Sequence, residues 1–278
     1  MTDVQTAPEP TRSEDGAKAG GAFIWYELMT TDAAAAKDFY DAVVGWNIAA
    51  ESEFPNGYRM IGRSDGKFAG GAMQLSEESK EHGARPCWLG YILVPDVDAS
   101  VASISAEGGQ VHMPAFDIPG VGRVAMVTDP QGAPFYVMKP RPPEGDPDAK
   151  SDVFSPTEAQ RVRWNELSTT DQDGAIDFYK RQFGWNQEGA MPMGEMGDYR
   201  FIQANGVNIG AIMRKPPQRP VSAWSYYIGV DDIDRAIQAI TEGGGQVLNG
   251  PNEIPGGEFA LNAMDPQGAA FGIVGPRK

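Results

Sequence analysis

Two glutamates, Glu27 and Glu166, occupy the same place in an eight-residue stretch that occurs twice in the chain. The stretch reads Trp-Tyr-Glu-Leu-Met-Thr-Thr-Asp at residues 25–32 and Trp-Asn-Glu-Leu-Ser-Thr-Thr-Asp at residues 164–171. Alternate residues of a β-strand point to opposite faces, so each glutamate shares a face with the tryptophan two positions before it. A carboxylate desolvated beside an indole has a raised pKa and can exchange protons near neutral pH. Glu27 and Glu166 are therefore the candidate catalytic residues.

The repetition of these glutamates also has a structural explanation. In a chain with two similar halves, both carboxylates could lie close to the axis that relates the halves. There they would be hydrogen-bonded to backbone N–H groups or to Tyr26, Arg163 or Asn165. The sequence leaves the catalytic and the structural interpretation open.

A methionine-rich loop at residues 189–197 could cover a ligand, or it could be a variable loop. Aromatic residues are frequent on the predicted strands. Aromatic walls bind flat or apolar molecules through burial and stacking. The same side chains could instead fill the core. The candidate ligand-binding residues are Trp25, Trp88, Tyr91, Tyr136, Trp164, Trp224, Tyr226 and Met193.

The elements that must position these residues follow from periodicity and turn signals. Thr31 or Asp32 can cap a helix that carries the apolar pair Phe39-Tyr40 and ends at Gly45. The remaining elements are predicted as strands at 47–52, 58–63, 68–75 and 88–94, a helix at 96–107, and strands from 110, at 122–127 and at 135–139. This order is two βαβββ units in succession.

The whole arrangement returns in the second half of the chain. Gly-Gly-Gln-Val, which ends the second helix and opens a strand, occurs at 108–111 and 244–247. Asp-Pro-Gln-Gly, where we expect a hairpin turn, occurs at 129–132 and 265–268. We therefore divide the chain into a disordered tail (1–21), a first module (22–140), a stiff Pro-rich linker (141–160) and a second module (161–278).

These motifs together resemble the vicinal oxygen chelate superfamily, which includes glyoxalases, bleomycin-resistance proteins and extradiol dioxygenases. The matching pieces are the strand ending in Thr-Thr-Asp, the helix with Phe-Tyr followed by Gly-Trp, and the two repeated turns. The resemblance implies an α+β fold of two tandem modules. In each module, a pair of βαβββ units would form an incomplete barrel around a cleft.

Members of the superfamily that are enzymes usually hold a divalent metal with His and Glu side chains. At the matching positions this chain has Trp25, Leu89, Tyr136 and residues 72–74 in the first module. The second module has Trp164, Ser225, Gly272 and residues 212–214. None of these is an imidazole or a carboxylate, whereas a divalent ion needs several N, O or S ligands. We therefore expect no metal and no other cofactor.

The composition narrows the classes of partner. The formal net charge of −15 disfavours nucleic acid and anionic membranes, and no apolar run is long enough for a membrane span or signal peptide. One cysteine and the absence of a signal peptide favour a cytoplasmic protein. We expect a small-molecule ligand and a monomer or homodimer.

Three functions remain in competition. The first choice is a protein without the usual metal site that binds a small aromatic or amphipathic molecule in an aromatic-lined cleft. The alternative is a metal-independent, glyoxalase-like lyase or isomerase acting on a small carbonyl compound, with Glu27 or Glu166 as acid and base. A scaffold without a small ligand has no support in any exposed basic or heptad pattern.

Overall fold

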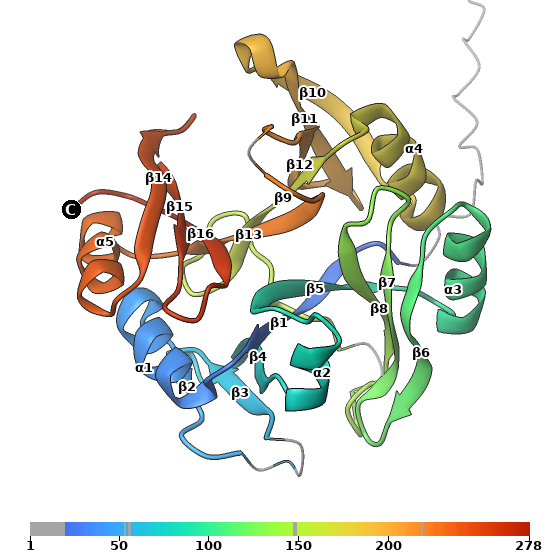
Figure 1. Cartoon of the computed structure of the whole chain (residues 1–278), viewed down its shortest axis with the longest axis horizontal. Coiled ribbons are helices and arrows are strands. Elements are labelled where there is room, and N and C mark those ends of the chain that lie inside the picture. The colour runs from blue at the N-terminus through green and yellow to red at the C-terminus, as the bar shows by residue number, and fades with distance from the viewer. Residues whose placement is uncertain (1–19, 53, 55–56, 147–148, 218) are drawn as a thin grey trace, which may run out of the picture.

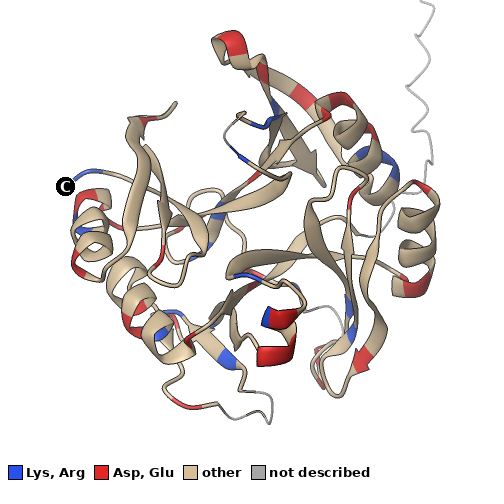
Figure 2. Ribbon diagram, viewed as in Figure 1, with Lys and Arg blue, Asp and Glu red and all other residues tan. Residues whose placement is uncertain are grey.

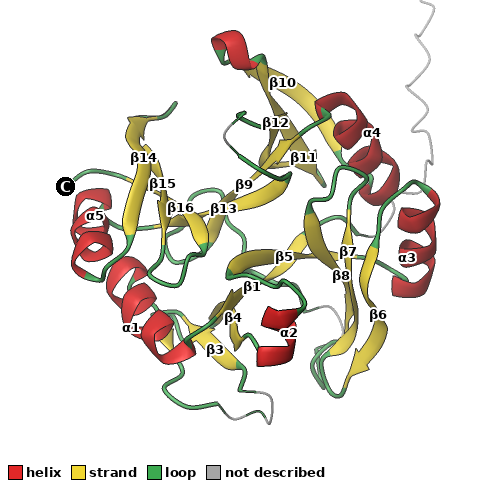
Figure 3. Ribbon diagram, viewed as in Figure 1, coloured by secondary structure: helices red, strands yellow, loops and turns green. Residues whose placement is uncertain are grey.

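The protein folds into two eight-stranded sheets that are related by the internal repeat (Figures 1 and 3). The structure is a computed structural model, and it describes residues 20–278 except 53, 55–56, 147–148 and 218. The strand orders are β2-β3-β4-β1-β5-β8-β7-β6 and β10-β11-β12-β9-β13-β16-β15-β14. Neither sheet closes on itself. The predicted α+β fold of two tandem modules is confirmed.

The elements have the following bounds. The first sheet comprises β1 (Phe23–Thr30), β2 (Asn47–Ile48), β3 (Arg59–Gly62), β4 (Phe68–Gln74), β5 (Cys87–Leu93), β6 (Val111–Ile118), β7 (Gly122–Thr128) and β8 (Pro134–Pro140). The second comprises β9 (Val162–Thr169), β10 (Asn186–Pro192), β11 (Asp198–Ala204), β12 (Val207–Arg214), β13 (Ala223–Gly229), β14 (Gln246–Glu253), β15 (Phe259–Met264) and β16 (Ala270–Gly275). The helices are α1 (Ala33–Val44), α2 (Glu77–Glu81), α3 (Val97–Ala106), α4 (Gln172–Phe183), α5 (Ile233–Glu242) and the short 3₁₀ helix η1 (Gly194–Met196).

The ends of the first helix of each module follow from local chemistry. Of the two predicted caps, Asp32 is the one that accepts hydrogen bonds from the first turn of α1, and Asp171 does the same for α4. Gly45 and Gly184 end these helices in the left-handed conformation, with φ of 80° and 69°. The predicted helix boundaries are confirmed, whereas the short helix α2 was not predicted.

The segments in front of the two modules are packed rather than free. Trp46 donates its indole N–H to the carbonyl of Gln160 at 2.9 Å, and Trp185 donates to the carbonyl of Gly21 at 2.7 Å. Val153 within the predicted linker is buried. The linker is therefore part of the folded body over its second half, and Gly21, which we assigned to the tail, is held in place. Residues 1–19 of that tail lie outside the described residues.

Each module's first helix packs on the other module. Figure 1 shows α1 beside α5 and α3 beside α4. The Tyr40 hydroxyl of α1 donates to Asp265 at 3.0 Å, and the equivalent Tyr179 hydroxyl of α4 donates to Asp129 at 3.2 Å. Arg235 of α5 also donates to two carbonyl groups at the end of α1. The two modules therefore share one continuous core.

The aspartates of the repeated turns have two functions in this packing. One carboxylate oxygen of Asp129 accepts N–H bonds from Gln131 and Ala133, which is the turn geometry that we expected. The other oxygen accepts the bond from Tyr179 of the other module. Asp265 repeats both contacts. The turns therefore join the modules as well as their own strands.

Unlike residues meet where the two sheets approach each other. Tyr26 and Asn165 hold equivalent positions in the repeat, and the Tyr26 hydroxyl donates to the Asn165 side chain at 2.8 Å. Gly90 and Tyr226 are the next equivalent pair, and the Gly90 N–H donates to the Tyr226 hydroxyl at 2.7 Å. A Cβ at position 90 would lie 2.9 Å from that hydroxyl, so the close approach requires glycine.

In the described part of the chain, no helix has both the length and the apolar character needed to cross a bilayer.

The bond between Tyr179 and Asp129 can be tested by removing the hydroxyl. We expect Tyr179→Phe to lower the free energy of unfolding by about 1–3 kcal/mol, because it leaves a buried carboxylate oxygen without its donor. Urea denaturation near neutral pH measures the change. Thr241→Ala, which removes an exposed hydroxyl bond within α5, is the control and should change stability by less than about 0.5 kcal/mol. An equally small effect of Tyr179→Phe would show that the bond does not join the modules.

Candidate functional site

The residues that could do chemistry gather on the inner face of each sheet, which is the face turned away from the helices. On β1 this face carries Trp25 and Glu27, and the strand register places Trp25 beside Tyr91 of β5. Tyr91 in turn lies beside Tyr136 of β8, and the two rings stack at 4.2 Å between centroids. The alternation read from the repeated stretch therefore put Glu27 and Trp25 on the correct common face.

Glu27 is enclosed by phenols. Its side chain is 2% exposed, and its Oε2 accepts a hydrogen bond from Tyr91 at 3.0 Å. Burial raises the pKa of Glu27 to about 7, although the Tyr91 and Tyr58 hydroxyls bond to its ionised form. Its Oε1 has no hydrogen-bond partner among the described residues. A neutral carboxylic acid near pH 7 suits this enclosure better than a carboxylate.

Glu166 has a more open version of the same surroundings. It is half-buried, and its Oε2 accepts hydrogen bonds from Tyr199 at 2.8 Å and from Tyr227 at 3.3 Å. Burial of the carboxyl group raises the pKa of Glu166, while the Tyr199 bond and the positive charge of Arg219 oppose that shift. Trp164 donates its indole N–H to Tyr199 at 2.7 Å. Glu166 is therefore the candidate acid or base that solvent can reach.

The other candidate ligand-binding residues divide between the two sides of the sheets. Trp88 donates its indole N–H to Tyr40 at 2.9 Å, and Trp224 donates to Tyr179 at 3.0 Å, so both belong to the core beneath the helices. Tyr226 lies at the contact between the sheets. The expectation that these three side chains line the clefts differs from their observed position, because β5 and β13 turn them toward the helices. Trp25, Tyr91, Tyr136 and Trp164 do lie on inner faces, where ligand contact stays a prediction.

Gly272 and Met193 are two further residues of the second module. Gly272, which matches a metal-ligand position of the superfamily, opens no space, because the ring of Tyr227 lies where its Cβ would be. Met193 is 40% exposed at the turn between β10 and β11, beside η1, which lies at the outer end of these strands in Figure 1. A covering role for Met193 stays a prediction.

The superfamily's metal can be tested against the donor atoms present. At the inner face of each module the described residues offer one carboxylate, held by phenols that donate to it, and no imidazole. No group of three or more His, Cys, Asp or Glu side chains comes together in the described part of the chain. A site with one carboxylate and protonated phenols does not fit a divalent ion, which needs several anionic or lone-pair ligands at short range.

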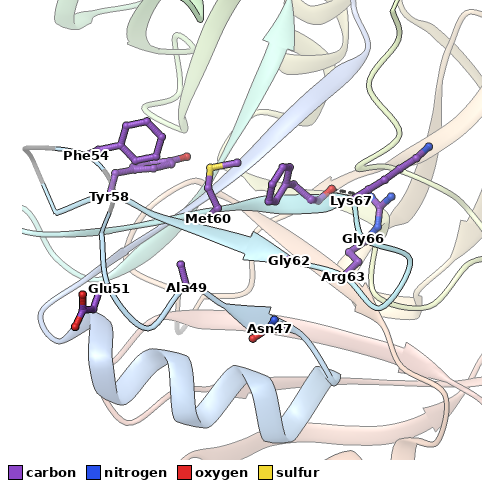
Figure 4. Close-up of a pocket in the computed structure, with 11 residues that line it drawn as sticks. Asn47, Ala49, Glu51, Phe54, Tyr58, Met60, Gly62, Arg63, Gly66 and Lys67 are labelled. Carbon is purple, nitrogen blue, oxygen red and sulfur yellow. Dashed lines mark hydrogen bonds between the residues drawn. The ribbon is translucent and has the colours of Figure 1, made fainter.

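A groove that the sequence analysis missed lies on the inner face of the first sheet, at its β3–β4 side. It encloses about 320 Å³. In Figure 4, Phe54, Tyr58 and Met60 extend along one side of the groove, and Lys67 lies at its other end. We call it the Tyr58 groove; it is lined by Asn47, Ala49, Glu51, Phe54, Tyr58, Met60, Gly62, Arg63, Gly66, Lys67 and Phe68.

Tyr58 connects this groove to the enclosed glutamate. Its hydroxyl accepts the indole N–H of Trp25 at 2.7 Å and bonds to Glu27. Any Cβ at position 71 would overlap the Tyr58 hydroxyl. Gly71 therefore lets the phenol lie over β4 and reach Glu27 on the adjacent strand β1. The alternation of Tyr58, Met60 and Gly62 on one strand face was the sequence signal that could have revealed the groove.

Comparison with known proteins agrees with this architecture. The sequence model of the Glyoxalase/Bleomycin resistance protein/Dioxygenase superfamily matches residues 22–137 and 161–273. The chain belongs to this superfamily. A Mycobacterium tuberculosis relative named "Putative glyoxylase CFP32" is 34% identical over 91% of this chain and 94% of its own. The anthracycline biosynthesis protein DnrV of Streptomyces peucetius is 29% identical over 92% and 94%.

Solved structures of superfamily members share the fold. The Mn(II)-bound glyoxalase from Novosphingobium aromaticivorans has a TM-score of 0.62 at 18% identity and covers 93% of this chain and 84% of its own. The 2,3-dioxygenase LapB from Pseudomonas sp. KL28 has a TM-score of 0.60 at 13% identity, with 94% of each chain covered. At these identities the likeness concerns the fold alone.

The raised pKa of Glu27 has a measurable consequence for stability. Between its unfolded pKa and about 7, the folded protein keeps the proton that the unfolded chain loses. The contribution of Glu27 to the free energy of unfolding therefore falls as pH rises through this window, by about 3 kcal/mol in total. Glu27→Gln has no proton to lose, so its stability relative to the parent should rise between about pH 5 and about pH 8.

Urea denaturation at both pH values measures this difference. Glu81→Gln, a change at an exposed glutamate of α2, should keep a constant difference from the parent. Parallel stability curves for Glu27→Gln and the parent would contradict the enclosure of a neutral carboxylic acid.

Proposed function

We propose that the chain binds a small planar aromatic or amphipathic molecule in the Tyr58 groove, without a metal. The observation that carries this proposal is a groove of about 320 Å³ whose lining combines three aromatic rings and a thioether with two cations. Ligand pockets of this kind begin at about 300 Å³ and are mostly apolar with a few polar groups. Phe54 and Phe68 are 44% and 46% exposed, so a bound ring would cover apolar surface that now faces water.

The polar groups of the groove favour an amphipathic ligand. Lys67 lies exposed at one end and also contacts Asp152, whereas the Arg63 guanidinium behind it is buried and already paired with Asp65 and Asp152. A ligand ring stacked beside Tyr58 would therefore have its polar edge near the Lys67 ammonium and its flat body against apolar side chains. The name of the relative DnrV supports this chemistry, because anthracyclines are planar polycyclic molecules.

A second candidate function is favoured by the half-buried Glu166. A carboxylate with a raised pKa that solvent can reach suits removal of a proton from the carbon next to a carbonyl group. In such a step Glu166 would take the proton, leaving an enolate, and would return a proton to a different atom or face. Tyr199 and Tyr227 would hold the carboxylate in position.

The binding proposal is tested with two matched substitutions. We expect Phe68→Ala to weaken binding of 1-anilinonaphthalene-8-sulfonate, or of an anthracycline, roughly tenfold, because it removes one wall of the groove. Phe116→Ala changes a phenylalanine that is 40% exposed on β6, outside the groove, and should leave the affinity unchanged. Fluorescence titration measures both. Equal affinities for the parent and Phe68→Ala would place any aromatic ligand elsewhere.

The acid–base candidate is tested by proton exchange in D₂O. Hydroxyacetone is a small carbonyl probe whose carbon-bound protons can be followed by NMR. We expect the parent to catalyse their exchange and Glu166→Gln to lose roughly a hundredfold of that rate while remaining folded. Glu27→Gln should keep the rate, because Glu27 is enclosed. Absence of exchange above the protein-free rate would remove catalysis of this reaction from Glu166.

A further inference from the structure

A cation without a carboxylate partner reaches the inner face of the second sheet. Arg219 lies in the loop between β12 and β13, where Figure 2 shows Lys and Arg in blue. Its guanidinium donates to Ser168 of β9 and to Ser225 of β13, each at 3.1 Å. Both serines are buried, with exposures of 1% and 6%. We call this cluster the Arg219 corner.

The positive charge of the Arg219 corner is only partly balanced within the protein. Among the residues described, no Asp or Glu carboxylate forms an ion pair with the Arg219 guanidinium, and the nearby carboxyl whose pKa its charge lowers is that of Glu166. Glu166 is the neighbouring negative group, and its Oε2 already accepts bonds from two phenols. A partly buried guanidinium normally has an anionic partner, because its desolvation is otherwise uncompensated.

The hydrogen bonds of the Arg219 corner are also unbalanced. Each serine oxygen accepts a bond from Arg219, so each hydroxyl proton remains to be donated. In the described part of the chain neither hydroxyl donates to a protein acceptor, and the guanidinium has further N–H groups. The corner is therefore rich in donors and poor in acceptors, which suits the oxygens of a carboxylate.

The fold itself does not require this corner. In the first module the positions equivalent to Ser168 and Ser225 are Met29 and Leu89, and both pack in an apolar cluster on the inner face. The first module keeps the same strand order without any of these polar groups. The Arg219 corner is thus a property of one module, as a binding site would be.

The surrounding strand places an aromatic side chain farther along the same face. Ser168, Glu166 and Trp164 alternate along the inner side of β9, so about 13 Å separates Ser168 from Trp164. Trp164 packs edge-to-face with Phe201 at 6.1 Å between ring centroids. We propose that the second module binds a small aromatic carboxylate, with its carboxylate group at Arg219, Ser168 and Ser225 and its ring toward Trp164.

The test compares a carboxylate with its neutral amide on the intact protein. 3-Phenylpropionate and 3-phenylpropionamide have nearly the same shape, and calorimetry or ligand-observed NMR at fixed ionic strength measures both. We expect the carboxylate to bind at least roughly tenfold more tightly than the amide. Equal affinity for the two probes, or no binding of either up to about 10 mM, would overturn the proposal.

Substitutions then assign the site. Arg219→Gln should remove the preference for the carboxylate, and Ser225→Ala should reduce it, with thermal melting as the check of folding. Arg214→Gln changes an exposed arginine at the end of β12 and should keep the preference. An unchanged preference in a folded Arg219→Gln would overturn the assignment. Should that variant not fold, Ser225→Ala and the comparison of the two probes on the parent decide. Phe68→Ala should leave this binding intact, which separates it from the Tyr58 groove.

Discussion

Each module of this protein depends on the other for the burial of its first helix. The Tyr40 and Tyr179 hydroxyls reach the buried turn aspartates of the opposite module, and the aromatic rings around them belong to one shared core. Burial of apolar surface provides the stabilisation, and the hydroxyl bonds satisfy carboxylates that could not be buried alone. The helix side of both sheets is thereby committed to holding the modules together. The inner faces are where the two modules can differ without loss of the fold.

The inner faces have diverged from a common plan. Both keep a glutamate that accepts bonds from tyrosines, and in both a tryptophan indole donates to one of those tyrosines. In the first module the stacked pair Tyr91 and Tyr136 covers Glu27, while the second has Gly272 where the first has Tyr136. Tyr227 then lies over that glycine and leaves Glu166 half-buried. The presence of Tyr136 in the first module and its absence from the second thus accompanies the difference between the enclosed Glu27 and the half-buried Glu166.

Much of this arrangement could be predicted from the sequence because the repeat presents every signal twice. Strand alternation put Trp25 and Glu27 on one face, and Asp32 and Gly45 marked the ends of the first helix. Alternation within β5 shows that Trp88 and Tyr91 lie on opposite faces of the sheet. It does not show which of them faces the helices, because that depends on the register of β5 with β1. The Tyr58 groove was missed because the course of the Tyr58 side chain depends on a glycine of the neighbouring strand β4, and Arg219 was missed because it lies in a loop without periodicity.

The unlike pairs at the contact between the sheets give the chain a built-in preference for its own two halves. Tyr26 meets Asn165, and Tyr226 meets the backbone at Gly90. Two copies of the first module, brought together in the same way, would place two phenols face to face at one level and two glycines with a void at the other. The Tyr–Asp contacts of the helices would suit two identical modules equally well, so the unlike contacts between the sheets are what favours the pairing of one module with the other.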